Sequence, residues 1–326
     1  MNPAGGAAAP TRAQADRFAQ ALALLAPPGP IALAVSGGPD SLAMLLLGAA
    51  THAGNVIAAT VDHGIRPESA GEARMVAKLC RRLGLPHATL RVEVGGGGGP
   101  QAAAREARYP ALERWAIEAG AVALATAHHL DDQAETVLLR LARGAGVGGL
   151  AGVRPARRLA SGLVLVRPLL GWRRAELGAI VAAAGVVPVD DPSNRDPRYD
   201  RTRARTLLAG GWPEAARLAA VAAHLADAEA ALGWATAREG ERRIGRAQGV
   251  ALLDPADLPD ELLRRLVAHL VREIDGGDAA IAGPDLTRLI ERLRRGEHAT
   301  LGQVKAIPGE RWRFERAPAR RGPLDR

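Results

Sequence analysis

Short apolar runs alternate with helical patterns through the first half of the chain, and this alternation restricts the fold more than any other feature. It is typical of βαβ units, which form a parallel sheet with helices on both faces. Because both faces are covered, the strands are apolar throughout. Strands are predicted at residues 31–35, 55–61, 87–94 and 121–127, and the helices that follow them at 40–52, 68–84, 102–119 and 131–143.

The pattern changes after "GGWP" at residues 210–213, where Ala/Leu/Arg helices begin. We therefore predict an α/β, Rossmann-like parallel sheet flanked by helices, then a smaller all-helical domain, then a short basic C-terminal β-hairpin and tail. Three tryptophans, Trp212, Trp234 and Trp312, are expected in the core or the hairpin, and the alternative is that they are platforms for stacked bases. The predicted parts are an N-terminal tip and helix (1–30), the catalytic domain (31–212), the helical domain (213–296), and the hairpin and tail (297–326).

Composition excludes several classes of protein. No run approaches the roughly 20 apolar residues needed to span a bilayer, and the start of the chain lacks the pattern of a secretory signal. Cys80 is the only cysteine, so the chain has no disulfide framework and no Cys-based metal site. We expect a cytoplasmic protein without a membrane partner, and the oligomeric state stays open.

Positive charge is concentrated in the second half of the chain. Residues 1–150 hold 13 Arg/Lys and 12 Asp/Glu, whereas the remainder holds 30 and 23. This asymmetry favours a polyanion-binding surface joined to a small-molecule site. The alternative is a GC-rich genome that encodes arginine in place of lysine, with no nucleic-acid partner. Lys78 and Lys305 are the only lysines in the sequence.

The turn after the first strand reads Ser36, Gly37, Gly38, Pro39, Asp40, Ser41. Its glycines let backbone N–H groups approach a ligand, and the helix that follows adds a positive N-terminal end, so the turn is suited to phosphate. Asp40 would repel a phosphate unless a cation lies between them, which indicates Mg²⁺. An ordinary strand–turn–helix with Ser36 or Asp40 as N-cap is the alternative.

This turn resembles the PP-loop of the ATP pyrophosphatases, and the resemblance implies that ATP is cut between its α- and β-phosphates. Further stretches are similar, in type and order, to the motifs of the tRNA(Ile)-lysidine synthetases, over about residues 30–210. They are "VDHGIRPES" (61–69), "AAAREARYPAL" (102–112), "AHHLDDQAETVLLRLARGAGVGGLAG" (127–152), "RPLL" (167–170) and "DDPSNRDPRYDRTRAR" (190–205).

That family resemblance implies a ligase that forms a carbon–nitrogen bond. ATP would activate the C2 oxygen of the wobble cytidine in a tRNA(Ile) with a CAU anticodon. Free L-lysine would then replace it through its ε-amine, giving lysidine, AMP and pyrophosphate. The implied cofactors are ATP and Mg²⁺, and the implied partners are the tRNA and lysine.

Acidic and imidazole side chains follow the fourth predicted strand. Asp131 and Glu135 are four residues apart on one helical face, so this group could bind Mg²⁺ or hold the lysine ammonium. A solvated acidic helix start, favoured by the helix dipole, is the alternative. We expect catalytic roles for Asp40, Arg105, His128, Asp131, Asp132 and Glu135, with Asp40 and Asp132 as metal ligands.

Two basic groups are expected around the substrates. ATP would contact the loop residues Ser36–Ser41 together with His63, Arg66 and Arg108, since guanidinium groups match phosphate oxygens. The tRNA would contact Arg198, Tyr199, Arg201, Arg203 and Arg205. Surface arginines paired with nearby glutamates, and a capping role for His63, remain the alternatives. The family pattern has Asn where this chain has Thr202.

Three other functions are alternatives to lysidine synthesis. A tRNA-thiolating PP-loop enzyme needs paired cysteines or an iron–sulfur cluster, and Cys80 alone supplies neither. An amidotransferase-type synthetase needs an ammonia source, for which the sequence carries no glutaminase-like cysteine motif. A catalytically silent RNA- or nucleotide-binding adaptor is the alternative from outside the enzymes.

Overall fold

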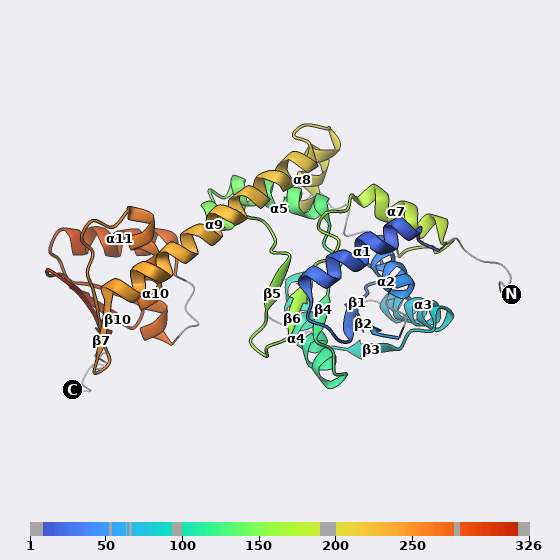
Figure 1. The fold of residues 1–326 in the computed structure, drawn as a ribbon, viewed down its shortest axis with the longest axis horizontal. Helices are drawn as coiled ribbons and strands as arrows, with labels where there is room; N and C mark the ends of the chain where they lie inside the picture. The colour runs from blue at the N-terminus through green and yellow to red at the C-terminus, as the bar shows by residue number, and fades with distance from the viewer. Residues whose placement is uncertain are drawn as a thin grey trace. The chain divides into compact units, whose positions relative to one another are not determined.

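The computed structural model describes residues 9–51, 54–62, 64, 67–92, 100–189, 200–276 and 281–318, with the side chains of 67–68 and 100–107 outside this set. The chain divides into two compact units, Met1–Ala226 and Asp227–Arg326 (Figure 1). The long helix α9 (Ala215–Arg243) contains the boundary between them. Within the described helices, no segment is both long and apolar enough to cross a bilayer.

The first unit is built on a six-stranded sheet with the order β3-β2-β1-β4-β6-β5. Its first five strands in this order are parallel, and only the edge strand β5 runs antiparallel, against β6. The chain order reverses between β1 and β4, which is the position where doubly wound sheets bind ligands. The strands are β1 (Ile31–Ala34), β2 (Val56–Asp62), β3 (His87–Arg91), β4 (Ala123–Ala125), β5 (Ala156–Arg158) and β6 (Val164–Val166).

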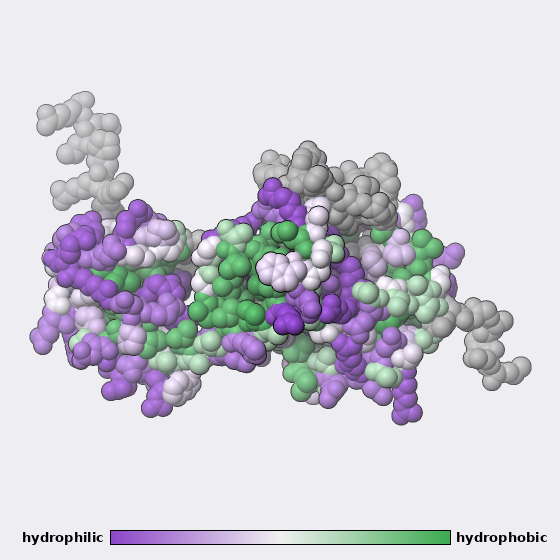
Figure 2. All heavy atoms as spheres, turned by 90° about the horizontal axis from the view of Figure 1, so that it is seen from above, coloured by the Kyte–Doolittle hydropathy of each residue, from purple (hydrophilic) through white to green (hydrophobic). Residues whose placement is uncertain are grey.

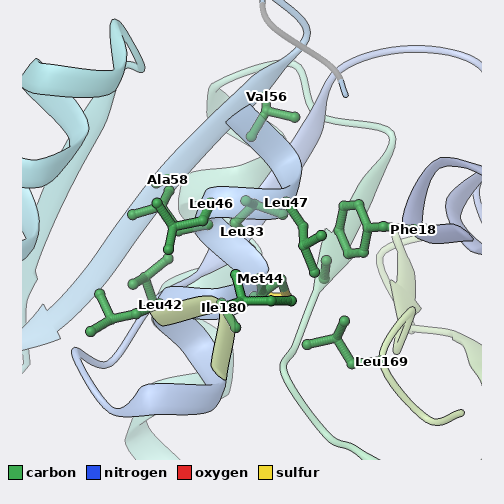
Figure 3. Close-up of a cluster of buried hydrophobic side chains, with 14 of the residues drawn as sticks. Phe18, Leu33, Leu42, Met44, Leu46, Leu47, Val56, Ala58, Leu169 and Ile180 are labelled. Carbon is green, nitrogen blue, oxygen red and sulfur yellow. The ribbon is translucent and has the colours of Figure 1, made fainter. Parts of the chain in front are cut away.

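Apolar layers cover both faces of this sheet, as the apolar strands predicted. Along β1, Ile31 and Leu33 belong to one buried cluster and Ala32, between them, belongs to another, because successive side chains point to opposite faces. On the first face α1 and α7 pack against α2, and Figure 3 shows Phe18, Met44 and Ile180 from these helices close together. The helices are α1 (Arg12–Leu25), α2 (Pro39–Thr51), α3 (Pro67–Leu83), α4 (Pro100–Glu118), α5 (Leu130–Ala142), α6 (Val147–Leu150), α7 (Arg174–Ala183) and α8 (Asp200–Ala209).

The thiol of Cys80 lies in this core. The side chain is fully buried on α3, and burial raises the pKa of the thiol to about 11. Since the thiolate is the reactive form, we expect Ellman's reagent at pH 8 to leave the native protein unmodified and to label one thiol per chain in urea. Complete labelling of the folded protein within the mixing time would contradict this placement.

The second unit packs two helices on an antiparallel sheet with the order β7-β8-β11-β10-β9. Its core joins Leu266 and Leu270 of α10 to Leu289 of α11 and Phe314 of β11. The elements are α10 (Asp260–Asp275), α11 (Gly283–Arg294), β7 (Ile244–Ala247), β8 (Val250–Leu253), β9 (Ala299–Leu301), β10 (Val304–Ile307) and β11 (Trp312–Arg316).

The strand pair β7–β8 was not predicted, because an all-helical domain was expected over residues 213–296. Gln248 and Gly249, both with positive φ, form the two-residue turn that reverses the chain there. Because β8 pairs with β11, the segments predicted separately as 213–296 and 297–326 meet in one sheet. The structure thus places the unit boundary within α9 and groups the C-terminal hairpin with the helices.

The expectation for the tryptophans was right for one and wrong for two. Trp312 is buried, with 5% of its surface exposed, and packs in the core of the second unit. Trp212 is 85% exposed and Trp234 is 65% exposed. Trp212 lies in the turn between α8 and α9, and Trp234 lies on α9.

Candidate active site

A cavity of about 240 Å³ lies at the carboxyl ends of the central strands β1, β2 and β4. Its floor comes from the loop after β1, and its walls come from α4, α5 and α8. The position matches the chain reversal in the sheet, where parallel α/β folds bind their ligands. The side chains of the cavity that carry chemistry are Ser36, Asp40, Ser41, Arg108, Tyr109, His128, Asp132, Arg201 and Arg205.

The loop from Ser36 to Ser41 is closed on itself by the Ser41 hydroxyl. That hydroxyl accepts a hydrogen bond from the Ser36 amide at 3.1 Å and donates one to the Gly38 carbonyl at 2.9 Å. Gly37 has φ +85, and its carbonyl accepts from the Val189 amide at 3.0 Å. This tight turn leads directly into the N-terminus of α2, so the loop is a preformed site for an anion.

Gly37 is required by both conformation and space. A Cβ at this position would lie 3.0 Å from Val189 Cγ2 and 3.4 Å from Met75 Cε, whereas one at Gly162, which has φ +90, would meet nothing within 4 Å. Both alanine variants should lose about 1–2 kcal/mol of stability from the positive φ. We expect only Gly37→Ala to weaken ATP binding, by roughly tenfold or more, because it displaces the loop. Isothermal titration with ATP tests this, and equal ATP affinities in the two variants would contradict it.

His129 connects the loop to α5. The imidazole is fully buried and caps α5, with Nδ1 accepting a hydrogen bond from the Asp131 amide at 3.2 Å. Its Nε2 lies 3.4 Å from Asp40 Oδ2 and 3.4 Å from Asp132 Oδ2. One ring nitrogen therefore lies close to two carboxylates, one from α2 and one from α5.

The imidazole of His129 and the carboxylate of Asp132 shift each other's pKa values. Burial lowers the pKa of His129, but the neighbouring carboxylates of Asp40 and Asp132 outweigh it, so the pKa is raised overall. Burial raises the pKa of Asp132, but His129 and Arg201 outweigh it, so the pKa lies below its ordinary value. Asp132 is therefore a carboxylate at neutral pH.

The pair Asp40 and Asp132 fits a magnesium ion. Both present carboxylate oxygens at one edge of the cavity, and the buried Asp40 Oδ1 has no hydrogen-bond partner. Mg²⁺ in ATP-using enzymes is held by one or two carboxylates together with substrate phosphates. Within the described residues, no group of three or more His, Cys, Asp or Glu could hold a metal without such help.

Glu135 is the centre of an arginine network. It is only 1% exposed, and its two oxygens accept from Arg201 Nε at 2.9 Å and Arg205 Nε at 2.7 Å. Arg174 Nη2 lies 3.6 Å from the same carboxylate. One buried charge on α5 thus fixes arginines from α7 and α8, and two of them reach the main cavity.

A second cavity of about 260 Å³ lies beyond this network. It is lined by carboxylates and guanidinium groups together, including Asp131, Arg173, Arg174 and Glu214. Arg205 lines both cavities, and the neighbours Asp131 and Asp132 line one each. The start of α5 therefore lies between the main cavity, which is suited to phosphate, and the second cavity, whose lining has both positive and negative side chains.

Comparison with known proteins decides the family. The profile described as a PP-loop domain matches residues 10–210. The tRNA(Ile)-lysidine synthase of Zymomonas mobilis subsp. mobilis is 48% identical over 298 residues, which cover 90% of each chain. That of Novosphingobium aromaticivorans is 48% identical over 313 residues, covering 94% of this chain and 95% of the relative. The chain belongs to the tRNA(Ile)-lysidine synthase family.

Membership in the tRNA(Ile)-lysidine synthase family confirms the resemblance found in the sequence. It makes the protein an ATP-using ligase of the PP-loop class. Among solved structures, the U34-tRNA thiolase NcsA of Methanococcus maripaludis matches with a TM-score of 0.55 and 20% identity, over 66% of this chain and 78% of that one. At this identity the match concerns the fold alone, and it agrees with the predicted α/β class.

The structure gathers most of the site residues expected for a lysidine synthase. The main cavity is lined by Ser36, Gly38, Asp40, Ser41, Arg108, His128 and Asp132, but not by the loop residues Gly37 and Pro39. Asp131 and Glu135 line the second cavity. Arg201 and Arg205 line the main cavity, whereas Arg203 is largely exposed and pairs with Asp200. His63, Arg66, Arg198 and Tyr199 lie outside the described residues; Arg105 lies on α4, but its side chain is not described.

Three contributors were missed by sequence reasoning. Thr126 Oγ1 lies 3.0 Å from His128 Nδ1, and Gln133 holds the loop after α6 through the Val153 carbonyl at 2.9 Å. Gln133 stands inside the motif "HHLDDQAET", which could have drawn attention to it. Arg174 has no such signal, because it reaches Glu135 from a helix 39 residues further along the chain.

Proposed function

We propose that this enzyme joins L-lysine to C2 of the wobble cytidine of a tRNA(Ile) with a CAU anticodon. The cytidine C2 oxygen attacks the α-phosphorus of ATP, and pyrophosphate leaves. The lysine ε-amine then attacks C2, loses a proton, and displaces AMP. A cytoplasmic location belongs to the same proposal.

The main cavity suits ATP. The Ser36–Ser41 loop and the N-terminus of α2 would hold the pyrophosphate, while Arg108, Arg201 and Arg205 supply positive charge on the other side. Mg²⁺, held by Asp40 and Asp132 with the phosphates, would offset the charge that develops on the leaving pyrophosphate. In this arrangement the buried His129 would orient the carboxylates of Asp40 and Asp132.

The second cavity suits the amino acid. A lysine zwitterion carries one carboxylate and two ammonium groups, and this cavity offers arginines and carboxylates side by side. Arg173 and Arg174 would bind the carboxylate, and Asp131 would bind an ammonium group. The observation that carries the proposal is the arrangement of the two cavities on either side of the Glu135–Arg205 contact, which would bring nucleotide and amine to one point.

The test is incorporation of labelled lysine into a CAU-anticodon tRNA(Ile) transcript, with and without ATP and Mg²⁺. ATP-dependent incorporation with one AMP per lysine is expected. A transcript with a CAC anticodon, and ornithine in place of lysine, are the controls. AMP release that needs tRNA but gives no lysine transfer would mean another nucleophile, and no reaction of either kind would favour the adaptor.

A further inference from the structure

Trp212 is a large apolar side chain left almost entirely in water. It lies in the turn between α8 and α9 and is 85% exposed. An aromatic side chain of this size buries about 150–250 Å² when it packs, so Trp212 leaves a large apolar surface in contact with solvent. Leu207 on α8 and Val221 on α9 are exposed as well. Figure 2, which looks down on α8 and the start of α9, shows hydrophobic residues gathered there beside hydrophilic ones.

The turn that carries Trp212 also forms the rim of the second cavity. Gly211, directly before Trp212, and Glu214, two residues after it, line that cavity together with Arg173 and Arg174. Arg217, in the first turn of α9, is highly exposed and lies 3.5 Å from Glu214. Trp212 is therefore next in the chain to residues that line a cavity of mixed charge, which includes the guanidinium groups of Arg173 and Arg174.

An aromatic ring beside exposed arginines is the chemistry that binds an unpaired nucleotide. The face of a base stacks on the indole whatever its sequence, and the guanidinium groups attract the phosphates next to it. A free amino acid is too small to cover the indole while it occupies the cavity. A nucleic acid would cover the apolar residues with a base and would also place phosphates near the exposed guanidinium groups of Arg173 and Arg217.

We propose that Trp212 stacks on an unpaired base of the RNA loop and so guides the adjoining nucleotide into the active site. This inference rests on the proposed function, since it takes the RNA substrate from there. It adds a contact to the base next to the reacting cytidine, made by a turn that the sequence motifs do not include. The other exposed tryptophan differs, because the guanidinium of Arg238 already lies 5.3 Å from the ring centre of Trp234.

The experiment measures binding of a fluorescent CAU anticodon stem-loop by anisotropy at several salt concentrations. Trp212→Ala should raise the Kd by about 5- to 100-fold, the range for loss of one base–aromatic stack. The slope of log Kd against log salt should stay the same, because no charge is removed. Trp212→Phe should recover most of the affinity, and Trp234→Ala is the matched control, with unchanged affinity. ATP affinity and thermal stability should not change in any of these variants.

A set of stem-loops with one abasic nucleotide each locates the stack. At one position the abasic loop and Trp212→Ala should each weaken binding, with no further loss when they are combined. Equal affinity of Trp212→Ala and wild type, equal loss in Trp234→Ala, or no binding of the stem-loop to the wild type would overturn the proposal. So would a wild-type dimer that Trp212→Ala dissociates, because the surface would then serve self-association. Stem-loop binding that depends on Trp212, without lysine transfer, would instead overturn the proposed reaction and leave the stack in place.

Discussion

An Asp40→Ala variant is expected to lose at least about 100-fold in tRNA-dependent AMP formation, since outer partners of a metal alone typically contribute 10- to 100-fold. Asp40 offers a buried oxygen without a hydrogen-bond partner at the loop that would hold the phosphates, and its other oxygen lies 3.4 Å from His129 Nε2. Without this carboxylate, Mg²⁺ would lose one ligand. The negative charge on the leaving pyrophosphate would then be neutralised less well. Release of AMP from labelled ATP, with tRNA and Mg²⁺ present, is the measurement.

Two controls separate this effect from a loss of folding. Asp16→Ala removes an exposed carboxylate of α1 that pairs only at 3.8 Å with Arg12, and it should leave AMP formation unchanged. Asp40→Asn keeps the shape of the side chain and should raise the Mg²⁺ concentration needed for half-maximal rate. Unchanged AMP formation in Asp40→Ala would contradict both the metal site and the role of the loop.

A Glu135→Gln variant is expected to lose about 3 kcal/mol of stability, the lower end of the range for breaking a buried ion pair. The lower end applies because Arg174, Arg201 and Arg205 keep some contact with solvent, whereas Glu135 is 1% exposed. Arg201 and Arg205 also line the main cavity, so their release should weaken ATP binding by roughly tenfold. Urea denaturation and calorimetric titration with ATP measure the two effects.

Glu118→Gln is the matched control, because it makes the same substitution at an exposed position at the end of α4. Its stability should stay within about 0.5 kcal/mol of the wild type. If Glu135→Gln were equally mild, Glu135 would not hold the arginines in solution. If it lost stability but kept ATP affinity, Arg201 and Arg205 would be held in place by other contacts.

The order of strands and helices in the first unit followed from sequence because local patterns decide it. The apolar runs at 31–35 and 121–127 became β1 and β4, and the loop between strand and helix lies where parallel sheets bind ligands. The family also followed, since the motifs are contiguous stretches. The strand pair β7–β8 was predictable in principle from its Gln248–Gly249 turn, but its pairing with β11 was not.

The roles of single residues depended on the tertiary structure. From sequence, Glu135 shares a helical face with Asp131 and is free to meet a ligand; in the fold, arginines 66 and 70 residues further along occupy it. Arg201 and Arg205 were expected to contact the tRNA. In the fold they pair with Glu135 and line the main cavity. Trp212 was expected in the core and lies in water. Periodicity and turn chemistry act between neighbours in the chain and are written in the sequence, whereas ion pairs and exposure depend on which distant segments the fold brings together.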